Sequence, residues 1–170
     1  MKRHPARGLA AFLGVCSMFA APNLVLAQTP AAKPQKLSAS AIQIALVETG
    51  DVQIPPEFRF AIYERLVERM RSSGTFQKVF RSGDHEADGI PDLVTLHTTV
   101  AGFKEGSQTK RELTTVLGAT KVDVNTVVTA RDGHTLMDRK VTGRVRFFGE
   151  NLGATNDLAK RISKAVHETF

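Results

Sequence analysis

One stretch of this sequence constrains the fold more than any other: residues 119–147 are predicted to form a long β-hairpin. Two alternating runs, ATKVDVNTVVTA and TLMDRKVTGRVRF, meet at Arg131-Asp132-Gly133-His134. Asp-Gly between alternating strands is a strong hairpin signal, because a tight turn needs residues that accept positive φ. We place Asp132 and Gly133 at the centre of a two-residue turn, so that Arg131 faces His134.

The two-residue turn also sorts the side chains of both strands onto two faces, because side chains alternate along a strand. The predicted apolar face holds Val122, Val124, Thr126, Val128, Ala130, Thr135, Met137, Val141, Val145 and Phe147. The predicted wet face holds Lys121, Asp123, Asn125, Asp138, Lys140, Thr142, Arg144 and Arg146, with Val127 as the exception. A three-residue loop with a bulge at Gly133 is the competing turn, and it needs that bulge to restore the pattern.

Arg139 departs from this pattern, because it falls on the apolar face opposite Thr126. It is either a buried charge that serves a site or a residue at an edge or bulge whose aliphatic stem reaches water. We favour the second interpretation, since charged residues are seldom fully buried without a partner.

The start of the chain is predicted to be a secretory signal peptide, residues 1–27. Met1 to Arg7 carries three basic residues and no acid, Gly8 to Ala21 is apolar, and Val25-Leu26-Ala27 offers small residues before a cut. The apolar run is shorter than the roughly 20 residues that a membrane span needs. An N-terminal membrane anchor is the alternative.

Cys16 is the only cysteine of the chain, and it lies within this leader. A lipoprotein would be cut before that cysteine and anchored through it, but Val15 stands where a small residue is usual. We therefore favour cleavage after Ala27, with an outer-membrane lipoprotein through Cys16 as the alternative. Cleavage after Ala27 would leave no cysteine for disulfides, thiol catalysis or zinc binding.

The predicted mature chain has one domain. Residues 28–40 are rich in Pro, Ala, Ser and Lys and read as a disordered linker, and residues 41–170 suit a single domain. The 23 basic residues of the full chain, less three in the leader, leave 20 against 17 acids, a net charge of +3. This modest charge hints at weak contact with anionic lipid or cell wall, while the clustered bases and stacking aromatics of a nucleic-acid-binding protein are missing.

The periodicity of residues 41–170 predicts two helices and four or five strands. Ala41–Glu48 reads as a central strand, with Ile42, Ile44 and Leu46 on one face. A helix from Pro55–Pro56 to Ser73, a second helix capped by Thr155 or Asn156, and further strands at 76–81 and 92–103 complete the set. We expect an α/β protein: a two-layer α/β sandwich in which both helices pack on one face of a mixed sheet.

Two groups of residues are candidate metal sites. Asp84, Glu86 and Asp88 before Gly89 resemble the first half of an EF-hand calcium loop, but Thr95 stands where the bidentate glutamate belongs. A solvated loop is the favoured interpretation. The histidines of the mature chain, His85, His97, His134 and His167, form no tight ligand pair, and we favour surface or packing roles for them.

No catalytic motif is present. Nucleophile elbows, phosphate-binding loops and dinucleotide fingerprints are all missing from the sequence. Lys110-Arg111 could join Arg144 and Arg146 in a basic patch, although scattered solvated charge is the favoured interpretation. We predict no catalytic, cofactor-binding or metal-binding residue and no cofactor.

Residues 42–170 resemble a bacterial envelope family catalogued as domain of unknown function 4410. The resemblance lies in short structural motifs: Phe60–Leu66 leading to Gly74-Thr75-Phe76, Glu86-Ala87-Asp88, Gly118, Arg131-Asp132-Gly133 and Phe148-Gly149. The layout is also similar to periplasmic domains of the curli-secretion-lipoprotein and TolB N-terminal type. Members of the family often look like lipoproteins, from which the poor match around Cys16 departs, and the resemblance supplies no catalytic residue.

The expected function is that of an exported, periplasmic, non-catalytic envelope protein that acts by binding or assembly with other envelope proteins. One alternative is an envelope hydrolase whose acids or histidines are gathered by the fold. The other is a basic module that binds anionic lipid or cell wall.

Overall fold

The computed structural model describes residues 36–107, 119–145 and 151–170. The predicted signal peptide and Cys16 lie outside these residues. In chain order the elements are β1 (Ala41–Ile44), α1 (Pro56–Ser73), β2 (Lys78–Arg81), the 3₁₀ helix η1 (His85–Gly89), β3 (Leu93–Lys104), β4 (Thr120–Ala130), β5 (Thr135–Val145) and α3 (Gly153–Thr169). None of the described helices is both long enough and apolar enough to cross a membrane.

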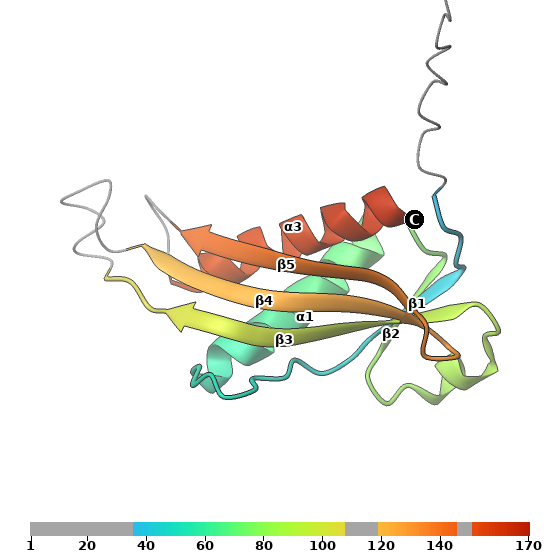
Figure 1. Ribbon diagram of the computed structural model, residues 1–170, viewed down its shortest axis with the longest axis horizontal. Helices are drawn as coiled ribbons and strands as arrows, with labels where there is room; N and C mark the ends of the chain where they lie inside the picture. The colour runs from blue at the N-terminus through green and yellow to red at the C-terminus, as the bar shows by residue number, and fades with distance from the viewer. Residues whose placement is uncertain (1–35, 108–118, 146–150) are drawn as a thin grey trace, which may run out of the picture. The chain divides into compact units, whose positions relative to one another are not determined.

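The strands form one mixed five-stranded sheet in the order β2-β1-β3-β4-β5. β1 lies between β2 and β3 and is parallel to both, whereas β3, β4 and β5 are antiparallel neighbours. Both helices lie behind the sheet in Figure 1, on the same face. The predicted fold class, a two-layer α/β sandwich with two helices on one face of a mixed sheet, is confirmed.

The core lies between the helices and the sheet. The predicted stripe of α1 is buried in full, namely Phe58, Ile62, Tyr63, Leu66, Val67 and Met70. Leu158, Ile162 and Val166 of α3 join the same cluster. α3 begins at Gly153, earlier than the predicted cap, and Thr155 lies in its first turn, where its hydroxyl donates to the Leu152 carbonyl at 2.7 Å.

The hairpin has the predicted strand register but a different turn. Val128 pairs with Met137 and Val124 with Val141, as expected. The backbone N–H groups of Gly133 and Ala130 donate to the carbonyls of Ala130 and His134, so the competing three-residue loop forms and the two-residue turn was wrong. Gly133 has φ 86°, and a register shift between Val128 and Thr129 restores the face pattern.

The first strand is shorter than predicted. β1 ends at Ile44, and Leu46, expected on the buried face, is 64% exposed. The chain still follows β3 to Glu48, whose N–H donates to the Thr98 carbonyl at 3.0 Å. No β2 residue lies beside this extension, because β2 ends opposite Ile44.

The polar loop of residues 82–91 covers part of the outer face of the sheet, over β1, β2 and the start of β3, and is not merely solvated. Ala87 of η1 is fully buried against Ala41, Phe80 and Leu93, which form a second small core. Arg131 of the hairpin turn holds the loop, donating to the carbonyls of Asp88 and Ile90 at 2.6 and 2.7 Å. The sequence could not predict that this loop packs on the sheet, because its residues show no periodic apolar pattern.

β5 is an edge strand, and α3 packs closely beside it. Gly143 permits this approach: a Cβ there would lie 2.5 Å from the Leu158 Cβ and closer still to the Ala154 carbonyl oxygen. Arg139 pairs with Thr126 as predicted and is exposed, which confirms the edge interpretation. The neighbouring Asp157 accepts a hydrogen bond from the Arg144 backbone N–H at 3.0 Å.

Residues 36–40, the end of the predicted linker, contact the end of α3 and the start of β3. The Leu37 N–H donates to the Thr169 carbonyl at 2.8 Å, and Lys36 donates to the His167 carbonyl at 2.7 Å. The hydroxyl and N–H of Ser40 both donate to the Asp92 carboxylate. The chain therefore enters the domain beside the C-terminus of α3.

Candidate functional site

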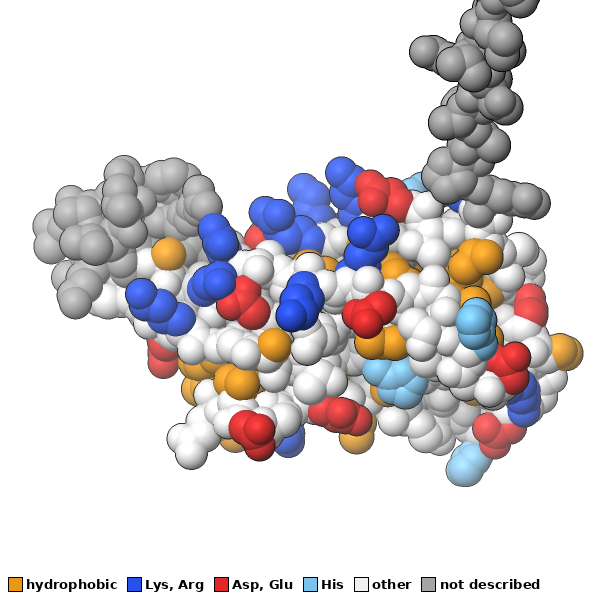
Figure 2. Space-filling model, in the orientation of Figure 1, with side chains coloured by type: hydrophobic (Ala, Val, Ile, Leu, Met, Phe, Trp, Pro, Cys, Tyr) orange, Lys and Arg blue, Asp and Glu red, His pale blue; other side chains and the backbone are white. Residues whose placement is uncertain are grey.

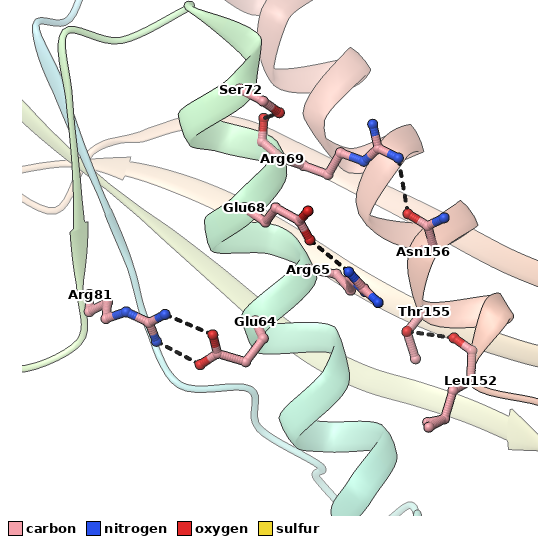
Figure 3. A network of polar contacts seen from close by, with 9 residues as sticks. All are labelled: Glu64, Arg65, Glu68, Arg69, Ser72, Arg81, Leu152, Thr155 and Asn156. Carbon is pink, nitrogen blue, oxygen red and sulfur yellow. Dashed lines mark hydrogen bonds and ion pairs between the residues drawn. The ribbon is translucent and has the colours of Figure 1, made fainter.

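A shallow groove lies between α1 and β2. It has a volume of about 450 Å³ and is lined by Glu64, Val67, Glu68, Arg71, Ser72 and Arg81. Its central contact is a bidentate ion pair, in which the two terminal nitrogens of Arg81 donate to the two carboxylate oxygens of Glu64 at 2.6 and 2.7 Å (Figure 3). The Arg81 guanidinium also lies 5.6 Å from the centre of the Tyr63 ring.

This ion pair ties the two elements together and offers no reactive group. The hydrogen bonds from Arg81 hold the pKa of Glu64 below its usual range, although desolvation opposes them. The same hydrogen bonds raise the pKa of Arg81. A carboxylate that stays ionised and has both oxygens engaged is a poor general acid or base near neutral pH.

Two further side-chain contacts of α1 also lie within the fold, whereas Arg59 and Arg71 of the same helix are exposed. Arg65 donates to Glu68 at 2.8 Å, and Arg69 donates to Asn156 of α3 at 3.1 Å (Figure 3). The first bond lies within α1, and the second joins α1 to α3. Glu64 and Arg69 of α1 therefore help to hold β2 and α3 in place.

A second hollow, of about 620 Å³, lies over the connection from β1 to α1. It is lined by residues 49–55 and by Arg59, so its polar atoms come mostly from one open loop. Asp51 and Arg59 are the charged residues that line it. This lining provides no paired acids and no nucleophile beside a base.

The structure keeps the predicted histidines apart. His97 lies on the outer face, 3.3 Å from the Thr129 hydroxyl, and His167 lies near the end of α3, 3.0 Å from the Thr75 hydroxyl. His85 lies in η1 and His134 beside the hairpin turn. None of them belongs to a group of three metal-ligating side chains within the described part of the chain.

The acidic loop has a structural use for one of its carboxylates. Asp84 accepts a hydrogen bond from the Glu86 N–H at 3.1 Å and so caps η1. Glu86 and Asp88 are exposed, and Asp88 lies 3.6 Å from His85. Within residues 36–107, 119–145 and 151–170, no group of three histidine, cysteine or acidic side chains could hold a metal ion.

The outer face of the hairpin carries one connected polar group. Asp123 accepts hydrogen bonds from Lys121 at 2.6 Å and from the Thr142 hydroxyl at 2.5 Å. Desolvation opposes the shift, but these bonds and the nearby Arg144 lower the pKa of Asp123. This carboxylate, like Glu64, is held ionised by its partners.

The feature that the sequence did not predict is a row of cations along the β5–α3 side of the domain, which we name the basic edge. Figure 2 shows Lys and Arg side chains gathered over β5 and α3. All six members are exposed: Arg139, Lys140, Arg144, Lys160, Arg161 and Lys164.

Few acids balance the basic edge. Asp157 pairs with Arg161 at 2.9 Å, and Glu168 lies 3.7 Å from Lys164. Among the described residues, Arg139, Lys140, Arg144 and Lys160 make no ion pair. Four unpaired cations on one side of a domain attract anions and perform no bond-breaking chemistry by themselves.

The basic edge differs from the basic patch considered from the sequence. Arg144 belongs to both, whereas Lys110, Arg111 and Arg146 lie outside the described residues. The α3 cations were predicted to face water, but their position beside β5 depends on tertiary packing around Gly143. The charge pattern of each element alone could not have joined them.

Comparisons with known proteins give a fold and no family. No family model matches this chain, and no curated protein matches it either. The resemblance to domain of unknown function 4410 therefore stays a prediction.

Solved structures do match. A point variant of the PelC dodecamer from Paraburkholderia phytofirmans matches with a TM-score of 0.58 and 10% identity over 81% of this chain and 94% of that chain. A second crystal form of the PelC dodecamer matches with the same TM-score and 8% identity, covering 77% and 88% of the two chains.

The hypothetical protein CT253 from Chlamydia trachomatis matches less well, with a TM-score of 0.46 and 9% identity over 75% of this chain and 93% of that chain. Identities this low show a shared fold alone. The likeness to PelC therefore supports the two-layer architecture described above.

Proposed function

We propose that this chain is an exported, non-catalytic protein of the bacterial cell envelope that acts by binding or assembly. The export signal predicted in residues 1–27 supports delivery beyond the cytoplasm. The resemblance to domain of unknown function 4410 supports an envelope location. Both are features of the sequence, and the fold agrees with the layout that the resemblance implies.

The observation that carries the proposal is how the domain uses its charged groups. Glu64, Asp84 and Asp123 serve as ion-pair partners or caps within the fold. The unpaired cations of the basic edge are instead exposed on one side. This arrangement supports action through a surface more than turnover in a pocket.

The likeness to PelC supports assembly as one form of this function. PelC is a dodecamer in both of the matching crystal forms. Here the sheet ends in β2 on one side and β5 on the other, so its two edges have different sequences. Unlike surfaces that meet head to tail produce rings when the rotation closes.

The test is to measure assembly and contact separately. Light scattering on the mature chain, residues 28–170, should give a mass above that of the monomer. In intact cells, a photoreactive benzophenone residue placed at Lys78, Lys140 or Asp51 should form a discrete adduct, because benzophenone attacks C–H bonds of proteins and glycans alike.

A monomer at every concentration that forms no adduct from any of the three positions would contradict the proposal. So would hydrolysis of envelope polymer by the purified mature chain. The control for the hydrolysis measurement is the substitution of Glu64 and Asp123 by Gln. Hydrolysis that depends on these acids would be lost in that variant.

A further inference from the structure

The basic edge is the strongest unassigned feature of the described residues. It joins β5 and α3, which lie side by side in Figure 1. Lys160 and Lys164 lie one helical turn apart, and Lys140 and Arg144 lie about 13 Å apart at strand rise. The six cations therefore form two short rows, one on each element.

The rows face more than one direction. Lys140 and Arg144 lie on the outer side of the sheet, and Arg139 lies on its helix side, because neighbouring side chains of a strand alternate. Lys160 and Lys164 lie on the exposed flank of α3. The basic edge thus continues around the side of the sandwich from one layer to the other.

This arrangement selects among anionic partners. A bilayer presents one plane, so it would meet only part of a surface that wraps around an edge. Interfacial binding also favours exposed apolar anchors. The large exposed apolar side chains of the described residues, Leu37, Leu46, Phe60 and Leu152, do not belong to the basic edge.

We infer that the basic edge binds a linear polyanion, a flexible polymer that carries regularly spaced carboxylate, sulfate or phosphate groups and bends from β5 over to α3. Arg139, Lys140 and Lys160 supply the attraction, since they make no ion pair among the described residues, and Arg144 adds to it although its charge also acts on Asp123. Asp123, Asp138, Asp157 and Glu168 are the acids within or beside the surface, and three of them already pair with Lys121, Arg161 and Lys164.

Binding of this kind depends on salt, because each contact releases a counterion from the polymer. For four contacts, the affinity should fall roughly 50-fold between 50 and 200 mM salt, by the slope known for single-stranded polyanions. Removing three contacts should reduce that fall to about 2–3-fold. The salt slope therefore counts the cations that take part.

The experiment titrates the mature chain into fluorescent dextran sulfate at several salt concentrations. The test variant carries Arg139→Gln, Lys140→Gln and Lys160→Gln, three exposed residues that make no ion pair within the described part of the chain. The control variant carries Arg59→Gln, Arg71→Gln and Lys78→Gln, which are exposed on α1 and β2 and lower the net charge by the same amount. Circular dichroism confirms that both remain folded.

The expected result is that the wild type and the control bind with the steep salt slope and the test variant binds with the shallow one. Equal losses in the two variants would overturn the inference, because net charge alone would then explain binding. Absence of binding at low salt would overturn it as well. In a parallel experiment, binding of the mature chain to vesicles of phosphatidylglycerol and phosphatidylcholine in equal parts is measured.

Binding to those vesicles without binding to the free polymer would overturn the inference and would indicate that the basic edge binds a membrane. This experiment is separate from the test of assembly: a protein that oligomerises but ignores dextran sulfate keeps the proposed function and loses this inference. A monomer that binds the polymer with the predicted slope keeps this inference and contradicts assembly as the form of the proposed function.

Discussion

The α1–β2 side and the β5–α3 side of the domain carry similar side chains and use them differently. On the α1–β2 side, Arg81 donates both terminal nitrogens to Glu64, and the neighbouring cations of α1 bond to Glu68 and Asn156. On the β5–α3 side, Arg139, Lys140 and Lys160 make no ion pair among the described residues, and no ion pair joins β5 to α3. Exposed cations without an ion pair also lie on the α1–β2 side, namely Arg59, Arg71 and Lys78. The helix–sheet contact beneath the β5–α3 side depends instead on close packing at Gly143.

The contrast separates stabilising charges from charges that are free to bind. An ion pair within the fold restrains both side chains and satisfies both partners. An unpaired cation on a surface adds little to stability and keeps its field available to an anion. Substitutions on the two sides should therefore affect different measurements.

The largest expected effects test whether the two sides share one core. Ile62→Ala in α1 and Ile162→Ala in α3 should each lower the free energy of unfolding by about 2–5 kcal/mol, because both side chains are fully buried. Chemical denaturation measures the loss. Leu46→Ala, at a position that is 64% exposed, is the control and should be nearly neutral.

Gly143→Ala should come next and should affect only the β5–α3 side directly. A new Cβ would meet backbone and Cβ atoms of α3 at 2.9 Å or less, and overpacking of this kind costs about 1–3 kcal/mol. Gly89→Ala is the matched substitution, since a Cβ there meets nothing within 4 Å. Equal melting temperatures for the two variants would mean that α3 does not approach β5 as described.

A smaller effect compares one paired arginine with one unpaired arginine. Arg81→Ala should cost about 1 kcal/mol or less, because the ion pair is partly exposed and screened by solvent. Arg139→Ala should change stability by no more than about 0.5 kcal/mol. If Arg139→Ala proved the more damaging in thermal melts, the distinction between the two sides would fail.

The smallest effect is the pH dependence of the Glu64–Arg81 pair. Because the pKa of Glu64 is lowered in the folded protein, the pair contributes stability above the usual value of 4.5 and loses it as pH falls through the folded-state value. Glu64→Gln should therefore differ from the wild type at pH 7, and the difference should shrink as the pH falls below 4.5. In an Arg81→Ala background the same substitution should lose most of that pH dependence.

The parts of the fold that follow a local period were predictable from the sequence. The buried stripe of α1 and the faces of the hairpin depend on spacings within one element, and the structure agrees with the stripe and with most of the faces. Thr135, predicted on the apolar face, instead pairs with Thr129 and is exposed, and Arg146 and Phe147 lie outside the described residues. The turn was placed wrongly because a second irregularity, between Val128 and Thr129, also restores the alternation, so the pattern fits either loop. Leu46 was misplaced because the alternation continues beyond the point where β2 ends.

The candidate site was less predictable, because it depends on which elements lie together. The sequence shows that Lys160 and Lys164 face water, and separately that Lys140 lies on the wet face of a strand. Gly143 permits α3 to lie close to β5, and this role is visible only in the folded structure. Arg131 is a similar case. The sequence predicts only that it lies in the hairpin turn, whereas in the structure it also bonds to the loop of residues 82–91.

The position of β1 between β2 and β3 has a consequence for the order of folding. Ala41 pairs with Lys78 and with Leu93, which lie 37 and 52 residues further along the chain, whereas β4 and β5 are joined by one short turn. Contacts that close long loops form slowly compared with local ones. If the chain is exported from its N-terminus, β1 emerges before both of its neighbours. Its apolar residues must then remain unpaired until β3 has followed, and during this interval the chain is most exposed to aggregation and to capture by chaperones.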